Sequence, residues 1–159
     1  MNLPFSAQQL KQHVDQDLAT CQSLLALLKQ EQEALKKRDA DTVEKVIEQK
    51  MPLLEILENS AKLRQAWALT ANQDANEAGW AAMITELADS ALKSNWQALK
   101  ESYLAVREQN EINGKLLSRH QKTITRLLDL MRGKTGGPSL YNATGYSSSQ
   151  AQSHKFGEA

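Results

Sequence analysis

The chain begins with a long stretch in which apolar residues recur at alternating steps of four and three, from Leu10 to Leu35. This spacing places them along one face of a helix. Ser6 precedes the stretch and Gln9 follows three residues later, which is the arrangement of a capping box. The pattern ends at the basic run 36–38, whose charges suit the carboxyl end of a helix. The sequence therefore predicts a first helix between Ser6 and this basic run.

A second stretch with the same spacing runs from Val43 to Ala68 and predicts a second helix. A capping box over residues 41–44 marks its start. Pro52 lies inside the stretch, and because proline lacks a backbone donor we expect a kink near residues 48–52, in preference to a break. The members of the two stripes are Leu10, Val14, Asp17, Cys21, Leu24, Leu28, Glu31 and Leu35 in the first, and Val43, Ile47, Lys50, Leu54, Leu57, Ala61, Arg64 and Ala68 in the second.

A third start signal lies at residues 74–77, and a long seam with the same rhythm then runs from Leu92 to Met131. At about 1.5 Å per residue, one helix over this whole segment would approach ~80 Å. We therefore allow for a bend or a break at Asn113-Gly114, which would turn three helices into four. Gly133 follows the last periodic residue and predicts the end of the helix.

These amphipathic segments, joined by short polar turns, predict an all-α fold. We expect an elongated antiparallel up-and-down bundle of three long helices, or four if the third is broken, with coiled-coil-like packing. The bundle domain is assigned to residues 1–132. Residues 133–159 are rich in Gly, Ser and Gln, and this composition predicts a flexible, disordered C-terminal tail.

Charge and composition narrow the classes of function. The chain has 19 Lys and Arg against 19 Asp and Glu, so no strong net field draws it to nucleic acid or to an anionic membrane. No apolar stretch approaches the roughly 20 residues that span a bilayer, so we expect no direct membrane insertion. Cys21 is the single cysteine and no signal-peptide pattern is present, which favours a cytoplasmic protein.

Groups that could carry catalysis or bind metal are sparse. His13, His120 and His154 are not preceded by a glutamate three residues earlier, so the Glu-x-x-His pairs of di-metal bundles are missing. Zinc spacings and phosphate-binding glycine loops are missing too. Cys21 lies on the first apolar stripe and is interpreted as a small buried hydrophobic residue. We therefore expect no enzymatic activity, no metal and no cofactor.

Polar and aromatic residues on the predicted helices suggest structural roles. Asn110 and Asn113 interrupt the apolar seam of the third helix, where such residues weaken self-packing and either set the register or leave the groove available. Trp67, Trp80 and Trp96 are interpreted as core and end-packing residues.

Two motifs in the C-terminal half are specific enough to compare with known families. Residues 110–117 read Asn-Glu-Ile-Asn-Gly-Lys-Leu-Leu, and residues 138–145 read Pro-Ser-Leu-Tyr-Asn-Ala-Thr-Gly. Together they closely resemble the C-terminal half of the FlgN family of flagellar type III secretion chaperones. A looser similarity extends over nearly the whole chain.

The resemblance implies a bacterial cytoplasmic chaperone without catalysis. Its clients would be the C-terminal helical regions of flagellar hook–filament junction proteins, which it would keep from assembling prematurely and deliver to the flagellar type III export gate. The implied partners are these junction proteins, the cytoplasmic domain of the export-gate membrane protein and the export ATPase complex. In similar chaperones a tail tyrosine contributes to docking on the gate, and by motif match this residue is Tyr141.

The last part of the third helix is the expected client-binding surface. An apolar seam offers amphipathic client helices a groove, and its partner helices are expected to end before it does. The hypothesised client-binding residues are Asn110, Asn113, Leu116, Leu117, Ile124, Leu127, Leu128 and Met131. The apolar members of this set could instead complete the core of the bundle. The alternative function is a homo-oligomeric coiled-coil scaffold or adaptor without a client-release cycle.

Overall fold

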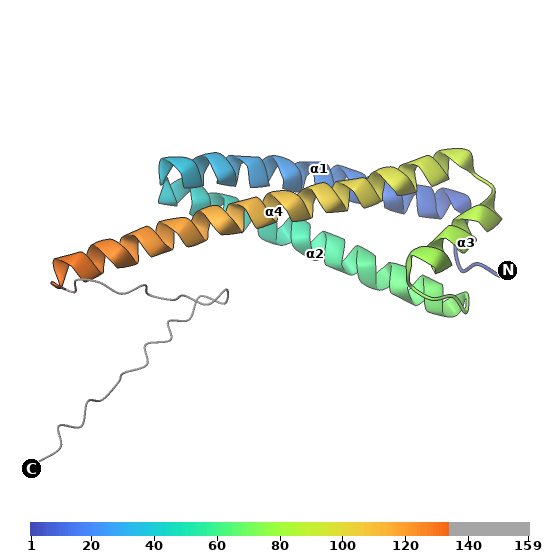
Figure 1. Ribbon diagram of the computed structural model, residues 1–159. Coiled ribbons are helices and arrows are strands. Elements are labelled where there is room, and N and C mark those ends of the chain that lie inside the picture. Colours follow the sequence, from blue (N-terminus) through green and yellow to red (C-terminus); the bar gives the residue numbers. More distant parts are fainter. Residues whose placement is uncertain (134–159) are drawn as a thin grey trace, which may run out of the picture. The chain divides into compact units, whose positions relative to one another are not determined.

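The computed structural model describes residues 1–133, and within that range it contains helices and no strand (Figure 1). The helices are α1 (Ala7–Lys37), α2 (Ala40–Thr70), α3 (Glu77–Leu87) and α4 (Ser90–Met131). The predicted all-α class is confirmed. The chain divides into two compact units, the first Met1–Gly114 and the second beginning at Lys115. The predicted tail lies outside the described residues from position 134 onward, and its disorder remains a prediction.

α1 and α2 form a hairpin whose ends are set by local hydrogen bonds. The predicted cap of α1 is confirmed, because the Gln9 N–H donates to Ser6 Oγ at 3.2 Å and the Ser6 N–H donates to Gln9 Oε1 at 2.8 Å. α1 ends at Arg38, which adopts the left-handed conformation with φ 57°. The second predicted capping box is wrong by two residues, since Asp39 caps α2 by accepting from the Thr42 N–H at 3.1 Å.

α2 contains Pro52 and still runs without interruption from Ala40 to Thr70. A proline ring removes the N–H that would bond the carbonyl four residues earlier, here that of Glu48. Glu48 and Pro52 are both exposed, so water can replace the missing donor. The helix is therefore not broken at this position, and the predicted kink remains a prediction.

Two members of the predicted α2 stripe lie on the exposed side of the helix, although Leu57 and Ala68 of the same stripe are buried as expected. Val46 is buried and Leu53 is half-buried, whereas the predicted members Ile47 and Leu54 are each 46 % exposed. Met51 is also exposed, so these three exposed residues form a second apolar strip along α2 with steps of four and three. The reason is tertiary: α2 is apolar on more than one face, and only packing decides which face is covered.

The segment predicted as one long third helix consists of two helices, α3 and α4. Ala88 ends α3 in the left-handed conformation with φ 50°, and Asp89 then caps α4 by accepting from the Leu92 N–H at 2.9 Å. α4 continues through Asn113-Gly114 to Met131. The fourth helix thus comes from an interruption at Ala88, and not from the position where the sequence suggested a break.

Three long helices pack along one another in the first unit. α2 runs antiparallel to α1, as the short turn between them requires. Residues 90–114 of α4 run parallel to α1, because Asn95 donates to Asp15 at 3.0 Å near one end and Asn113 donates to the Leu28 carbonyl at 2.7 Å near the other. The short helix α3 lets the chain reverse direction between α2 and α4.

The core of the first unit draws on all four helices and on the segment before α1. Trp80 of α3 stacks between Phe5 and Trp96, with ring centroids 5.9 and 4.9 Å apart. Each fully buried aliphatic side chain stabilises such a core by roughly 1.5–3 kcal/mol before the entropy cost is counted. The buried core residues are Phe5, Leu10, Val14, Cys21, Leu24, Leu28, Leu57, Ala68, Ala71, Trp80, Met83, Ile84, Leu92 and Leu99.

Two helical glycines provide a test of this packing. A Cβ at Gly79 would lie 1.9 Å from the Asp74 carbonyl oxygen, whereas a Cβ at Gly114 would meet nothing within 4 Å. We expect Gly79→Ala to lower the free energy of unfolding by roughly 1–3 kcal/mol. We expect Gly114→Ala to raise it by roughly 0.5–1 kcal/mol, because alanine restricts the unfolded chain and favours helix. Urea denaturation followed by circular dichroism measures both, and a destabilised Gly114→Ala variant would contradict the open environment of that residue.

Candidate functional site

The C-terminal part of α4 carries a row of large apolar side chains that are exposed to solvent. Leu116, the first candidate in this part of the helix, is half-buried. The other five apolar candidates in this part of the helix have side chains with exposed fractions between 44 % and 84 %. We call these five the exposed seam: Leu117, Ile124, Leu127, Leu128 and Met131.

The same helix is covered along its N-terminal part. Leu92 and Leu99 are buried, and Trp96, Tyr103 and Val106 pack against the core while partly buried. All of these lie on the rhythm that the sequence predicted for a single seam. One helix therefore presents a buried apolar face in the first unit and an exposed apolar face after Gly114. A contiguous exposed patch of this kind is typical of a surface that binds another protein.

The two asparagines of the predicted site lie in different environments. Asn110 is exposed, whereas Asn113 is only 4 % exposed. The Asn113 amide donates to the Leu28 carbonyl at 2.7 Å and to Glu31 Oε2 at 3.0 Å, and its oxygen accepts from Gln109 at 3.1 Å. These bonds hold α4 against α1. Asn113 therefore helps to fix the register of α4 in the bundle. Asn110 remains accessible to a partner.

Asn113 belongs to a polar cluster that joins three helices, which we call the Glu31 node. Lys50 of α2 donates to both oxygens of Glu31 of α1, at 2.9 and 2.8 Å. Both side chains are largely buried, with exposed fractions of 13 % and 10 %. Asn113 of α4 completes the cluster. A buried pair that is satisfied in this way specifies one alignment of the three helices.

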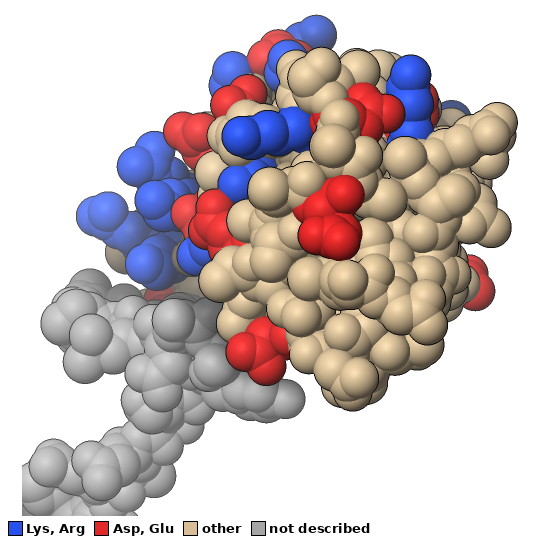
Figure 2. All heavy atoms as spheres, turned by 90° about the vertical axis from the view of Figure 1, so that its right-hand side faces the viewer, with Lys and Arg blue, Asp and Glu red and all other residues tan. Residues whose placement is uncertain are grey.

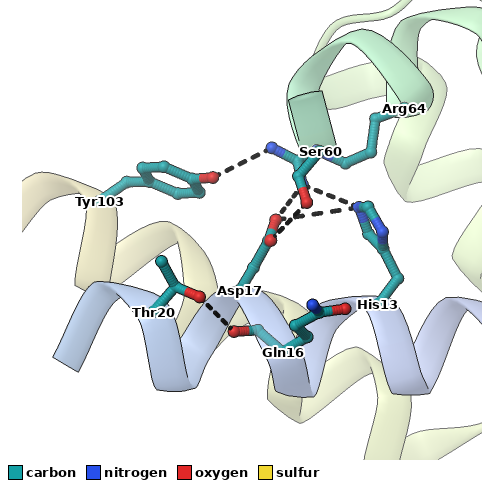
Figure 3. A network of polar contacts seen from close by, with 7 residues as sticks. All are labelled: His13, Gln16, Asp17, Thr20, Ser60, Arg64 and Tyr103. Carbon is teal, nitrogen blue, oxygen red and sulfur yellow. Dashed lines mark hydrogen bonds and ion pairs between the residues drawn. The ribbon is translucent and has the colours of Figure 1, made fainter. Parts of the chain in front are cut away.

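A second polar cluster, the Asp17 node, also joins α1, α2 and α4 (Figure 3). Asp17 is completely buried and accepts from Arg64 of α2 and, at 2.6 Å, from the Ser60 hydroxyl. The Arg64 guanidinium also donates to the Tyr103 hydroxyl of α4 at 3.1 Å and to His13 Nε2 at 3.0 Å. One guanidinium thus contacts all three long helices of the first unit.

Burial in this region shifts three ionisation equilibria, and it raises the pKa of the Tyr103 hydroxyl above its ordinary value. Desolvation lowers the pKa of His13 below 6.5; the Asp17 carboxylate opposes the shift and Arg64 adds to it. Burial also raises the pKa of the Cys21 thiol to about 11, with a further contribution from Asp17. Cys21 is 1 % exposed, so it is a protonated core residue, as the sequence suggested.

The pattern of apolar positions predicts neither node. Asp17 and Glu31 were placed on the first stripe, and Lys50 and Arg64 on the second, but without assigned partners. A usable signal was present: the two pairs join residues of opposite charge and fit a single antiparallel register of the hairpin. Charged residues of opposite sign at seam positions of neighbouring helices therefore indicate buried ion pairs.

The first unit also contains a cavity of about 270 Å³ between α2, α3 and α4. Trp80 and Trp96 form part of its wall, and its charged residues already have partners: Arg64 is held in the Asp17 node and Lys100 pairs with Glu77 at 2.8 Å. Figure 2 shows the side of the first unit where α3 lies, which has a broad surface of mostly uncharged residues, interrupted by acidic side chains. This cavity offers a ligand no unpaired charge.

Within residues 1–133, no three His, Cys, Asp or Glu side chains gather closely enough to hold a metal ion. None of the helices in that range combines the length and the apolar content needed to cross a bilayer. Tyr141, the predicted export-gate residue, lies outside the described residues.

Comparison with protein families gives a match over most of the chain. The family model described as FlgN protein matches residues 1–149 of the chain. Neither the curated proteins nor the solved structures include a significant match.

The environment of His13 predicts a pH dependence of stability. The unfolded state, with a histidine pKa near 6.5, binds more protons than the folded state, so stability falls as the pH decreases below that value. We expect the free energy of unfolding to decrease as the pH is lowered from about 7.5 to about 5.5. The His13→Gln substitution should make the free energy of unfolding less dependent on pH over this range. Urea titrations of both proteins over this range measure the effect, and equal slopes would show that His13 is not responsible.

Proposed function

The chain belongs to the FlgN family of flagellar export chaperones, and we propose that its clients are the C-terminal helical regions of flagellar hook–filament junction proteins. In this proposal the chaperone works in the bacterial cytoplasm, keeps the clients from assembling prematurely and delivers them to the flagellar type III export gate. The single observation that carries the proposal is the exposed seam of α4.

The exposed seam suits a client that is itself an amphipathic helix. Its residues are separated by three, four or seven positions over about four turns, which is the pattern by which one helix packs against another. Covering a large aliphatic side chain contributes roughly 1.5–3 kcal/mol, and the cost of association offsets a substantial part of the sum. Several seam residues must therefore be covered together to hold a client firmly.

The mechanism requires no chemical step, and FlgN proteins form a chaperone family and not an enzyme family. A client helix that would polymerise through its apolar face buries that face against α4 instead. The chaperone and other client molecules compete to bury the same apolar face of the client. The client is released when a stronger partner covers that face. Leu116 stands beside the seam and would complete the contact. Asn110 is a further proposed client contact, in the first unit, whereas Asn113 would act by keeping α4 in register.

Delivery to the gate is assigned to the tail. By the motif match, Tyr141 would dock on the cytoplasmic domain of the export-gate membrane protein, with the export ATPase complex as a further partner. An aromatic side chain with a hydroxyl group is well suited to such a contact, because it buries apolar area and also forms a hydrogen bond.

A homo-oligomeric scaffold is the second candidate, and the same seam favours it. Two copies could cover their seams in a coiled coil. Light scattering separates the two candidates: a scaffold is a tight oligomer when alone, whereas a chaperone forms a stoichiometric complex with a junction protein.

The client-binding proposal predicts a large effect of seam substitutions. We expect Leu117→Ser, Ile124→Ser and Leu128→Ser together to weaken binding of a junction-protein C-terminal fragment by about tenfold or more, because apolar contact area is lost. Isothermal titration calorimetry with the full chain measures the change. The matched control removes the apolar strip of α2 with Ile47→Ser, Met51→Ser and Leu54→Ser and should bind normally. Undiminished binding by the seam variant, or loss confined to the control, would place the client elsewhere.

The gate proposal predicts a separation of two activities. We expect Tyr141→Ala to leave the affinity for a junction-protein fragment unchanged and to weaken binding of the loaded chaperone to the export-gate cytoplasmic domain by about tenfold, as for an aromatic anchor residue. Tyr146→Ala is the matched control for loss of a tail aromatic. Biolayer interferometry on the immobilised gate domain would reject the assignment if the two variants bound equally well.

A further inference from the structure

The charge of the chain is distributed unevenly, although its total is zero. Residues 115–132 contain five basic side chains and one acidic one, a net charge of +4, so the rest of the chain carries −4. Four of the basic residues follow one another at steps of four, three and four, which places them on one face of α4. We call them the basic stripe: Lys115, Arg119, Lys122 and Arg126.

The side chains of the basic stripe are free to meet a partner. All four are exposed, and none forms an ion pair or a side-chain hydrogen bond with another described residue. By contrast, Lys50, Arg64 and Lys100 of the first unit each hold a carboxylate. At 1.5 Å per residue, the stripe is about 16 Å long and nearly straight. It is a line of positive charge that no carboxylate among residues 1–133 pairs with.

The basic stripe and the exposed seam lie on opposite sides of the same helical segment. A helix with an apolar face, a polar face rich in Lys and Arg, and little net hydrophobicity is the type that lies in the interface of a membrane. We propose that residues 115–132 bind the surface of an anionic bilayer, with the exposed seam against the acyl chains and the basic stripe attracted by the lipid phosphates. The helix lies in the interface and does not span it.

The distribution of residues in this segment favours an anionic bilayer as the partner over RNA or an acidic protein. The segment contains no Phe, Trp or Tyr, so it lacks the rings on which bases of single-stranded RNA stack. An acidic protein would satisfy the basic stripe alone, whereas an anionic bilayer satisfies the stripe and covers the aliphatic seam at the same time. The balanced charge of the whole chain remains compatible with this, because attraction within a Debye length depends on the local segment.

One consequence rests on the proposed function. A client that covers the exposed seam removes the apolar half of the membrane contact, so client and bilayer compete for the same segment. The free chaperone would gather at an anionic membrane surface, and loading with a client would weaken that association.

Vesicle flotation of the full chain tests the proposal. We expect the chain to float with vesicles of phosphatidylglycerol and phosphatidylcholine in equal amounts, not with phosphatidylcholine alone, and to be released by high salt. Each basic residue near an anionic surface contributes roughly a factor of five, so Lys115→Gln, Arg119→Gln and Lys122→Gln together should lower partitioning about 100-fold. The matched control neutralises three exposed lysines of the first unit, Lys11, Lys29 and Lys93, and should float like the unmodified chain.

The outcomes distinguish this inference from the proposed function. The stripe variant should still bind a junction-protein fragment, because its exposed seam is intact, and the fragment should displace the unmodified chain from vesicles. Equal flotation of the stripe variant and its control, or equal binding to neutral vesicles, would overturn membrane binding. Loss of fragment binding by the stripe variant, without vesicle binding by the unmodified chain, would assign the stripe to a protein partner and likewise overturn it. If vesicle binding holds and the fragment never binds, the membrane contact stands and the client proposal fails.

Discussion

The arrangement of the first unit depends on neutralising one buried charge, that of Asp17. This carboxylate has no access to water, and Arg64 compensates it while also bonding His13 and Tyr103. Removing one partner of such a buried pair typically costs about 3–5 kcal/mol, because the other charge is left without solvent or counterion. The pairing therefore favours the alignment in which α1, α2 and α4 meet at Arg64. The Glu31 node repeats the device further along, with Lys50 and Asn113.

These two nodes explain how a bundle can keep a defined structure while carrying exposed apolar side chains. Apolar stripes alone permit helices to slide or rotate at modest cost, whereas a buried charge must find its partner. Asn113 fixes α4 to α1 by its hydrogen bonds to Leu28 and Glu31, directly before the unit boundary at Gly114. The residues that follow keep their seam exposed and available.

The proposed activities converge on that last segment of α4. Its exposed seam is suited to a client helix, and its basic stripe, on the opposite side, adds attraction to an anionic surface. In these proposals one segment of α4 has two states, bound to a client or bound to a membrane, because both partners need the same apolar face. No catalytic group is required for such exchange, since differential burial alone shifts the balance.

The sequence by itself determined the helical class, the cap at Ser6, the end of α4 before Gly133 and the identity of the family, because these depend on local periodicity, local hydrogen bonds and short motifs. It also pointed to the apolar seam of α4. Only the tertiary structure decided which face of α2 is buried, that the third segment is interrupted at Ala88, and that Asn113 is a register residue while Leu117 to Met131 contribute an exposed surface. The reason is physical: a repeat of three and four shows that a face is apolar, but what covers that face depends on charges and helices far away in the chain.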